Sequence, residues 1–146
     1  MDKITKIGLI SSYKRNEIIF LNELENNLGK NWSLTKTENE SCNVDFIVKK
    51  NESLHGYVEL KCRKNLKHHT SLMIGYTKLC QIHLNYENTI LCWYCVDSKT
   101  IYSCKFNKDL LNCVDGFCNG SRVFYIPKSK CIIGMDKLIS LIRRDS

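Results

Sequence analysis

The sequence predicts an α/β fold in which a mixed central β-sheet is flanked by helices. Three observations lead to this prediction: an amphipathic helical segment near the start, two alternating segments that follow it as a hairpin, and a nearly continuous apolar strand after a second helical segment. Elements in this order pack as layers around one core. With 146 residues and no linker rich in Gly, Ser or Pro, residues 1–146 are expected to form a single domain.

The first predicted element is a helix from about Ser12 to Leu28. A serine is available to cap its start, and Gly29 follows where helices commonly end. At about 100° per residue, Glu17 falls near the centre of the apolar stripe of this helix. Its carboxylate is therefore expected to face the protein interior. The stripe is formed by Leu21, Leu24 and Leu28.

Two strands of a hairpin are predicted next, at Asn43–Val48 and Gly56–Cys62. Both segments alternate with the period of two that is typical of strands. In the second strand Glu59 and Lys61 are two residues apart, so they project from the same face. The polar residues Lys49–His55 are expected to form a longer loop between the strands.

A second helix is predicted at Thr70–Leu84, where apolar residues recur at helical intervals. Thr89–Val96 is almost wholly apolar and aromatic, as expected of a central strand covered on both faces. Thr100–Phe106 is predicted to be a further strand. The remaining expected elements are a short strand around Trp32 and Leu34, a short helix near Lys108–Leu111, a loop through Asp115, Gly116 and Gly120, a strand at Arg122–Ile126 and a terminal helix at Met135–Arg144.

The formal net charge of +7 favours an anionic partner, for which nucleic acid is the commonest choice. The start of the chain lacks the continuous apolar core of a signal peptide, and no apolar run is long enough to cross a membrane. The nine cysteines, an odd number, are expected to be reduced thiols and not a disulfide framework. We therefore expect an intracellular protein, cytoplasmic or nuclear and not secreted, with no membrane partner.

Asp45, Glu59 and Lys61 form the constellation that suggests chemistry. If the hairpin register brings Asp45 opposite Glu59, two carboxylates converge beside the ammonium group of Lys61. Phosphodiester hydrolysis needs a hard cation that neutralises phosphate charge and activates water, and a positive group near the nucleophile. We expect Asp45 and Glu59 to be direct metal ligands and the Leu60 carbonyl an additional one. Lys61 would position or activate water, and Glu17 would bind the metal directly or through water.

Glu and Lys alternate on many solvated strands, so the order of the surrounding elements gives this short motif its weight. A helix with Glu17, a strand with Asp45, a strand with Glu59-Leu60-Lys61, and then a helix and another strand resemble the common core of the PD-(D/E)xK nuclease superfamily. The resemblance covers roughly residues 12–96 and implies a restriction-endonuclease-like core. Val44 stands where the family often has proline, which many members lack.

This resemblance implies a divalent-metal-dependent endonuclease with Mg²⁺ or Mn²⁺ as cofactor. A small basic domain with Glu-x-Lys resembles Holliday-junction resolvases and related viral or phage nucleases, which act in DNA recombination and repair and are commonly homodimers. DNA, including branched DNA, is therefore the expected substrate. An RNA-cleaving nuclease of the same fold and a non-catalytic nucleic-acid-binding module are the alternatives, because one core serves many functions.

A basic run follows the second strand of the hairpin and is expected at the mouth of the cleft, where it would hold phosphates. Lys78 and Gln81 would join it from the next helix, with Lys78 approaching the scissile phosphate. A solvated loop is the alternative for the histidines of the run. The run consists of Arg63, Lys64, Lys67, His68 and His69.

Cys92 and Cys95 have the spacing of a zinc-binding pair. In a strand, however, they would point to opposite faces, which favours small buried apolar side chains. Cys113 and Cys118 lie in a predicted loop and are better candidates for a structural zinc site. A zinc-stabilised interaction domain is therefore a further alternative, and it would depend on the cysteines.

Overall fold

The strands of the protein form two sheets, which the computed structural model describes over residues 12–37, 44–66, 69–86 and 88–144. The larger sheet has the order β1-β2-β3-β5-β6-β9, and the smaller sheet has the order β4-β8-β7. The strands are β1 (Trp32–Lys36), β2 (Phe46–Lys50), β3 (Ser53–Arg63), β4 (Ser71–Gly75), β5 (Thr89–Cys95), β6 (Thr100–Lys105), β7 (Asp115–Cys118), β8 (Ser121–Pro127) and β9 (Ile132–Ile133). The helices are α2 (Ser12–Leu28), α3 (Tyr76–Asn85) and α4 (Met135–Arg143), with the 3₁₀ helices η1 (Lys108–Asn112) and η2 (Lys128–Lys130).

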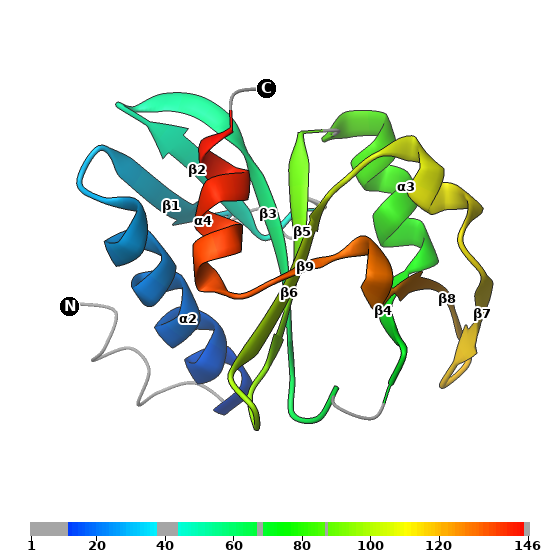
Figure 1. Cartoon of the computed structure of the whole chain (residues 1–146). Helices are drawn as coiled ribbons and strands as arrows, with labels where there is room; N and C mark the ends of the chain where they lie inside the picture. The colour runs from blue at the N-terminus through cyan, green and yellow to red at the C-terminus, as the bar shows by residue number, and fades with distance from the viewer. Residues whose placement is uncertain (1–11, 38–43, 67–68, 87, 145–146) are drawn as a thin grey trace.

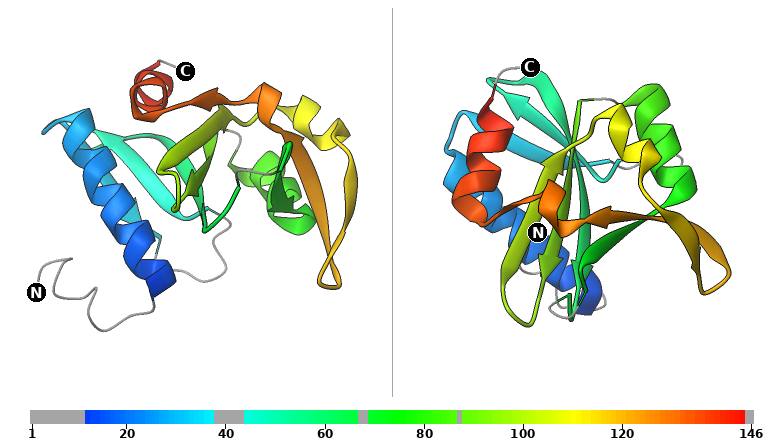
Figure 2. Two further views of the ribbon diagram at one scale, coloured as in Figure 1. Left: turned by 60° about the horizontal axis from the view of Figure 1, so that its bottom comes forward. Right: turned by 45° about the vertical axis from the view of Figure 1, so that its right-hand side comes forward.

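Helices cover both faces of the larger sheet (Figure 1). On one face, α2 and α4 enclose an apolar core together with Val58 and Leu60 of β3. On the other face, α3 and the smaller sheet pack around Leu79, Trp93 and Ile126. Figure 2 shows the β7–β8 hairpin at one end of the molecule, away from α2. β3 and β5 are parallel and the other neighbours in the larger sheet are antiparallel, so the predicted mixed sheet flanked by helices is confirmed.

β2 and β3 form the predicted hairpin, although their connection is shorter than expected. Lys50 pairs with Ser53, so the turn consists of Asn51 and Glu52. Both have positive φ, 52° and 68°, as in the primed turns that match the twist of a hairpin. The prediction of a longer loop is wrong. Most of the polar residues 49–55 belong to the ends of β2 and β3, which extend past the apolar core. A bulge shifts the register after the turn and leaves His55 of β3 without a ladder partner.

Residues 70–84 do not form the single helix that their spacing predicts. The first half is β4, in which Leu72 and Ile74 are buried, and α3 begins only at Tyr76. Gly75 has an extended backbone immediately before the helix, with φ −57° and ψ 139°. Alternation over so short a segment is easily masked by apolar spacing that continues into the following helix. Pairing with the distant strand β8 decides the conformation.

Residues 115–120 form a hairpin with β8 where the sequence prediction placed a loop. Cys118 pairs with Ser121 across a turn of Asn119 and Gly120, whose φ angles are 52° and 83°. Asn-Gly is among the strongest short-range signals for such a turn, so this hairpin could have been predicted. The strand β7 itself is hard to detect, because its side chains are exposed or half-buried.

Apart from the β2–β3 hairpin and residues 70–84 and 115–120, the predicted elements are confirmed to within about one residue at each end. α2 has the predicted bounds, and Gly29 follows it with a φ of 107°. β5 is buried except for the half-buried Tyr94, as expected of a central strand. Among the described helices, none combines the length and the apolar character needed to cross a membrane.

Gly56 provides a test of the contact between β3 and the segment before β5. A Cβ at this position would lie 2.9 Å from the carbonyl oxygen of Asn88, which accepts a hydrogen bond from the Tyr57 N–H. We expect Gly56→Ala to lower the free energy of unfolding by about 1–3 kcal/mol, as overpacking usually does. Equilibrium denaturation in urea would measure the change.

Gly75→Ala is the matched control for this experiment. A Cβ there would meet only the Cβ of Lys78, at 3.7 Å, which is an ordinary contact. The φ of −57° also suits alanine, so we expect a change within about 0.5 kcal/mol. Equal destabilisation by the two substitutions would contradict the close backbone contact at Gly56.

Candidate active site

The carboxylates of Asp45 and Glu59 come together across the β2–β3 hairpin. Phe46 pairs with Val58, and the same register extended by one residue places Asp45 opposite Glu59. Asp45 Oδ2 also accepts a hydrogen bond of 3.0 Å from the backbone N–H of Leu60. Asp45 lies in a bend immediately before β2 and not within the strand, and the predicted start of that strand lies outside the described residues.

Glu59 is the buried acid of the site, with only 1% of its surface exposed. Burial raises the pKa of Glu59 to about 7, and the charge of Asp45 acts in the same direction. The neighbouring ammonium groups lower this pKa: Lys61 Nζ lies 3.4 Å from Oε2 and Lys78 Nζ lies 3.6 Å from Oε1. Glu59 is thus surrounded by one carboxylate and two cations, an arrangement frequent at functional sites.

Both carboxylate oxygens of Glu59 are buried without a hydrogen-bond partner. A buried acceptor left in this state is unfavourable by about 1–3 kcal/mol, and by more when it is charged. Lys61 and Lys78 lie at ion-pair distance from Glu59, and Lys61 also lowers the pKa of Glu59 as a hydrogen-bond donor, but neither contact is a well-aligned hydrogen bond. The carboxylate is therefore well suited to a ligand that binds oxygen.

A small divalent cation fits this donor set. Mg²⁺ takes oxygen ligands, keeps several waters and is commonly held by one or two carboxylates, here those of Asp45 and Glu59. In the part of the chain that the structure describes, no three His, Cys, Asp or Glu side chains are grouped so that they could share an ion. Water or substrate oxygens would therefore complete the shell, and the Leu60 carbonyl stays a predicted additional ligand.

Lys78 approaches Glu59 from α3, because β4 and α3 cover the face of the sheet from which Glu59 and Lys61 project. The sequence prediction placed Lys78 near the scissile phosphate, and the structure places its ammonium group against the acid. The side chains of Lys61 and Lys78 are 23% and 26% exposed, in contrast to Glu59. An anionic ligand can therefore reach both ammonium groups from the solvent.

Among the described residues, Glu17 forms no metal-binding group of three with Asp45 and Glu59. It lies on α2, on the opposite face of the sheet, and its Oε1 is 3.6 Å from Nζ of Lys36. Glu17 is buried, as predicted, and its charge adds to the effect of burial in raising the pKa of Cys62 to about 12. Direct coordination of a metal shared with Asp45 and Glu59 receives no support from this geometry, and a contact through water stays a prediction.

The predicted phosphate-binding residues are divided between two places. Arg63 and Lys64 line a pocket beside the site, and Lys64 is exposed. Gln81 is on α3, where its Oε1 accepts a hydrogen bond of 3.2 Å from Asn85 Nδ2. Lys67 lies outside the described residues. Contact of these side chains with nucleic acid stays a prediction.

Trp93 is a neighbour of the site that the sequence prediction treated only as part of a strand. In the parallel pairing of β3 with β5 it lies beside Lys61, and its Nε1 donates a hydrogen bond of 2.9 Å to the carbonyl of Met73. No local pattern reveals this contact, because it depends on which strands become neighbours. The apolar run of β5 was the available signal that Trp93 would be buried.

The described cysteines are free thiols, and several of them are buried in the two cores. Cys92 and Cys95 are buried on opposite faces of β5, as predicted. Cys113 packs at the edge of the core beneath α3, and Cys118 lies in β7. Over the described ranges no set of three metal-binding side chains is present, so the zinc alternative has no site there.

The fold is similar to that of a known viral protein. The chain superposes on the structure of D212, a nuclease from a fusselovirus, with a TM-score of 0.65 and 12% sequence identity, over 92% of this chain and 94% of the other. No protein-family model matches the chain, and no curated protein matches its sequence. At this identity the similarity shows the fold, a central mixed sheet flanked by helices.

The raised pKa of Glu59 predicts how stability depends on pH. Without a divalent cation, native Glu59 binds a proton up to about pH 7, whereas the unfolded chain loses it near 4.5. Protonated Glu59 therefore stabilises the folded protein relative to the unfolded chain. This contribution to the free energy of unfolding is complete below about pH 4.5 and is lost as the pH rises to about 7, because between these values the native state binds more protons than the unfolded state. Thermal melts in EDTA across this range would measure the decline.

Glu59→Gln should flatten this pH dependence, because glutamine does not titrate. Glu23→Gln on the exposed surface of α2 is the matched control and should leave the dependence unchanged. Identical pH profiles for the wild type and Glu59→Gln would show that Glu59 is not the responsible group.

Proposed function

We propose that the protein is a divalent-metal-dependent endonuclease that hydrolyses phosphodiester bonds in DNA. The observation that carries the proposal is the buried Glu59 carboxylate, which lacks hydrogen-bond partners, faces Asp45 and contacts two lysines. The resemblance to the PD-(D/E)xK superfamily, the net charge of +7 and the fold shared with a viral nuclease support it.

Asp45 and Glu59 would hold Mg²⁺ or Mn²⁺, with the Leu60 carbonyl as a further ligand. Such an ion, when bound, would neutralise charge on the phosphate and lower the pKa of a water molecule. The Leu60 N–H orients Asp45, and the central strand β3 fixes Glu59. Ligands held in this way by regular secondary structure keep their geometry during the reaction.

Lys61 and Lys78 would act on the anionic groups of the reaction. Both ammonium groups lie at ion-pair distance from the Glu59 carboxylate, 3.4 Å for Lys61 and 3.6 Å for Lys78. If Asp45 and Glu59 held a cation, the ammonium groups of Lys61 and Lys78 would be available to bind phosphate oxygens or to orient the attacking water. Fixed charges placed where negative charge develops are usually the largest contribution to such catalysis.

Branched DNA is the more specific substrate that we propose, because the small basic domain resembles Holliday-junction resolvases. These enzymes are commonly homodimers, so we propose the same assembly here. A role in DNA recombination or repair inside the cell would follow. RNA cleavage by the same site and binding without cleavage are the alternatives that the assay below separates.

Lys61→Ala tests the reaction directly. We expect the wild type to cut at least one of four substrates, namely four-way-junction DNA, duplex DNA, single-stranded DNA or RNA, with Mg²⁺ or Mn²⁺ and not with EDTA. Loss of Lys61 should slow cleavage on the order of 100-fold or more, as loss of a charge-stabilising group commonly does. Single-turnover gel assays on the full chain would measure the rate.

Lys137→Ala removes the same charge from the exposed surface of α4 and should cut like the wild type. Metal-dependent cleavage that survives unchanged in Lys61→Ala would refute the assigned site. Binding of nucleic acid by the wild type without any cleavage would favour the non-catalytic alternative, and cleavage of RNA alone would replace DNA as the substrate.

Metal binding can be tested without activity. Mg²⁺ or Mn²⁺ binds only the folded site, so its addition above pH 7 should raise the melting temperature of the wild type. Asp45→Asn should abolish this rise, while its side-chain oxygen can still accept the Leu60 N–H. Glu23→Gln is again the control and should show the full rise. An equal rise in Asp45→Asn would place the cation elsewhere.

A further inference from the structure

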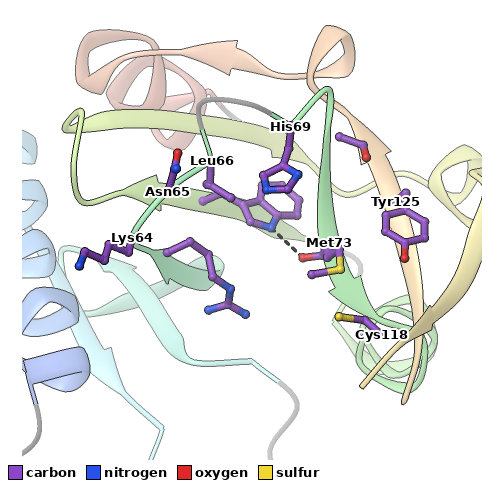
Figure 3. Close-up of a pocket in the computed structure, with 10 residues that line it drawn as sticks. Lys64, Asn65, Leu66, His69, Met73, Cys118 and Tyr125 are labelled. Carbon is purple, nitrogen blue, oxygen red and sulfur yellow. Dashed lines mark hydrogen bonds between the residues drawn. The ribbon is translucent and has the colours of Figure 1, made fainter. Parts of the chain in front are cut away.

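A pocket of about 400 Å³ lies beside the candidate active site, between the end of β3 and the smaller sheet (Figure 3). Its volume falls in the range usual for small-molecule sites. Apolar and aromatic side chains form one part of the lining, and two cationic residues lie at its other side, where Figure 3 shows the Lys64 side chain extending away from Tyr125. The residues that matter most are Leu66, Met73, Trp93 and Tyr125 in the first part, and Arg63 and Lys64 in the second.

The pocket continues the face of β3 from which the candidate catalytic residues project. Glu59, Lys61 and Arg63 alternate along this face, so Arg63 lies roughly 6.6 Å beyond Lys61. Trp93 lies beside Lys61 in the neighbouring strand and lines the pocket as well. A nucleic acid strand with one phosphate at Lys61 would therefore bring an adjacent nucleotide to the pocket.

Hydrogen bonds fix the walls of this pocket. The carbonyl of Arg63 accepts the backbone N–H of Val96 at 2.8 Å, which ties the end of β3 to the end of β5. Trp93 Nε1 donates to the Met73 carbonyl and ties β5 to β4 on the other side. A preformed pocket binds a ligand with little loss of conformational entropy in the protein.

Tyr125 gives the pocket an aromatic surface of defined orientation. It pairs with Met73 across β4 and β8, and Figure 3 shows the two side chains along the same wall of the pocket. A Cβ at Gly116 would meet the ring carbon Cε2 of Tyr125 at 3.0 Å, so the glycine gives the ring room to lie against β7. Tyr125 is only half-buried and leaves surface available to a ligand.

We propose that this pocket holds the unstacked base of a nucleotide adjacent to the scissile phosphate, with the base on Tyr125 and its phosphate near Arg63 and Lys64. The inference rests on the proposed nuclease function and adds an unpaired nucleotide to the definition of its substrate. Aromatic surfaces next to cationic side chains are the usual means of binding single-stranded nucleic acid. A base inside an intact duplex can enter only by leaving the stack.

Binding in EDTA tests the pocket, because it needs no cleavage. The probes are a fluorescently labelled single-stranded DNA and its duplex, titrated with the full chain and followed by anisotropy. Tyr125→Ala should weaken single-strand binding by about 5- to 100-fold, the effect of losing one stacked base, and should change duplex binding much less. Tyr125→Phe keeps the ring and should bind as the wild type does. Equal losses on both probes, or no loss on either, would overturn the proposal.

Lys64→Met and Lys137→Met form a matched pair for the cationic part of the pocket. The first should weaken single-strand binding and reduce its salt dependence, and the second should not. Equal effects of the two substitutions would overturn a local role for Lys64.

Photo-crosslinking of the wild-type chain keeps the test decisive even if Tyr125→Ala does not fold. Single-stranded DNA that carries 5-iodouracil should form adducts on Tyr125 or Met73, located by mass spectrometry. Adducts confined to other elements would overturn the proposal.

The pocket and the nuclease site can fail separately. Cleavage that depends on Lys61, together with unchanged single-strand binding by Tyr125→Ala, would refute the proposed role of the pocket and support the nuclease function. If Tyr125→Ala selectively lost single-strand binding and the wild type cleaved no substrate with a divalent metal, the pocket would be supported as a nucleotide-binding site and the nuclease function would be refuted.

Discussion

The parallel pairing of β3 with β5 is the constraint on which the rest of the structure depends. Parallel neighbours require a crossover connection, and here β4 and α3 form it over the face of the sheet that carries Glu59. The crossover buries the Glu59 carboxylate and brings Lys78 to it. The same pairing sets Trp93 beside Lys61. The candidate site and the adjacent pocket therefore arise from a single connection.

Stability alone does not account for a carboxylate at this point in the core. Burying an ion pair is often no better than burying apolar side chains of similar volume, so ion pairs are weak evidence for a structural role. Here the acid also lacks hydrogen bonds, lies opposite a second acid and has a strongly raised pKa. By contrast, Glu17 on the other face pairs with the exposed Lys36. Within the described residues, Glu59 therefore combines burial, a second carboxylate and two ammonium groups at one place, as function requires.

Local sequence patterns were sufficient to predict the elements that carry a continuous apolar stripe or run. They were insufficient where a distant strand or helix decides the structure. The bounds of α2 follow from its apolar stripe together with the capping serine and Gly29, and the burial of β5 follows from its nearly continuous apolar run. The strand β4 does not, because it exists through pairing with β8. Within the site, Glu59 and Lys61 share a face by strand geometry alone. The positions of Lys78 and Glu17 relative to that face depend on helix packing, which the periodicity of a single segment does not specify.

The meeting of Asp45 with Glu59 depends on the bulge in the hairpin. From the turn, Lys50 pairs with Ser53 and Lys49 with Leu54, and this register continued to the end of β2 would place Asp45 opposite Val58. Val58 projects into the other core, beneath α2. A one-residue shift exchanges the faces of a strand, so the unpaired His55 restores the register that sets acid against acid. The carbonyl of His55 accepts a hydrogen bond of 2.6 Å from Asn88 Nδ2, in the segment that leads into β5. The parallel pairing that creates the site thus also supports the bulge that aligns its two carboxylates.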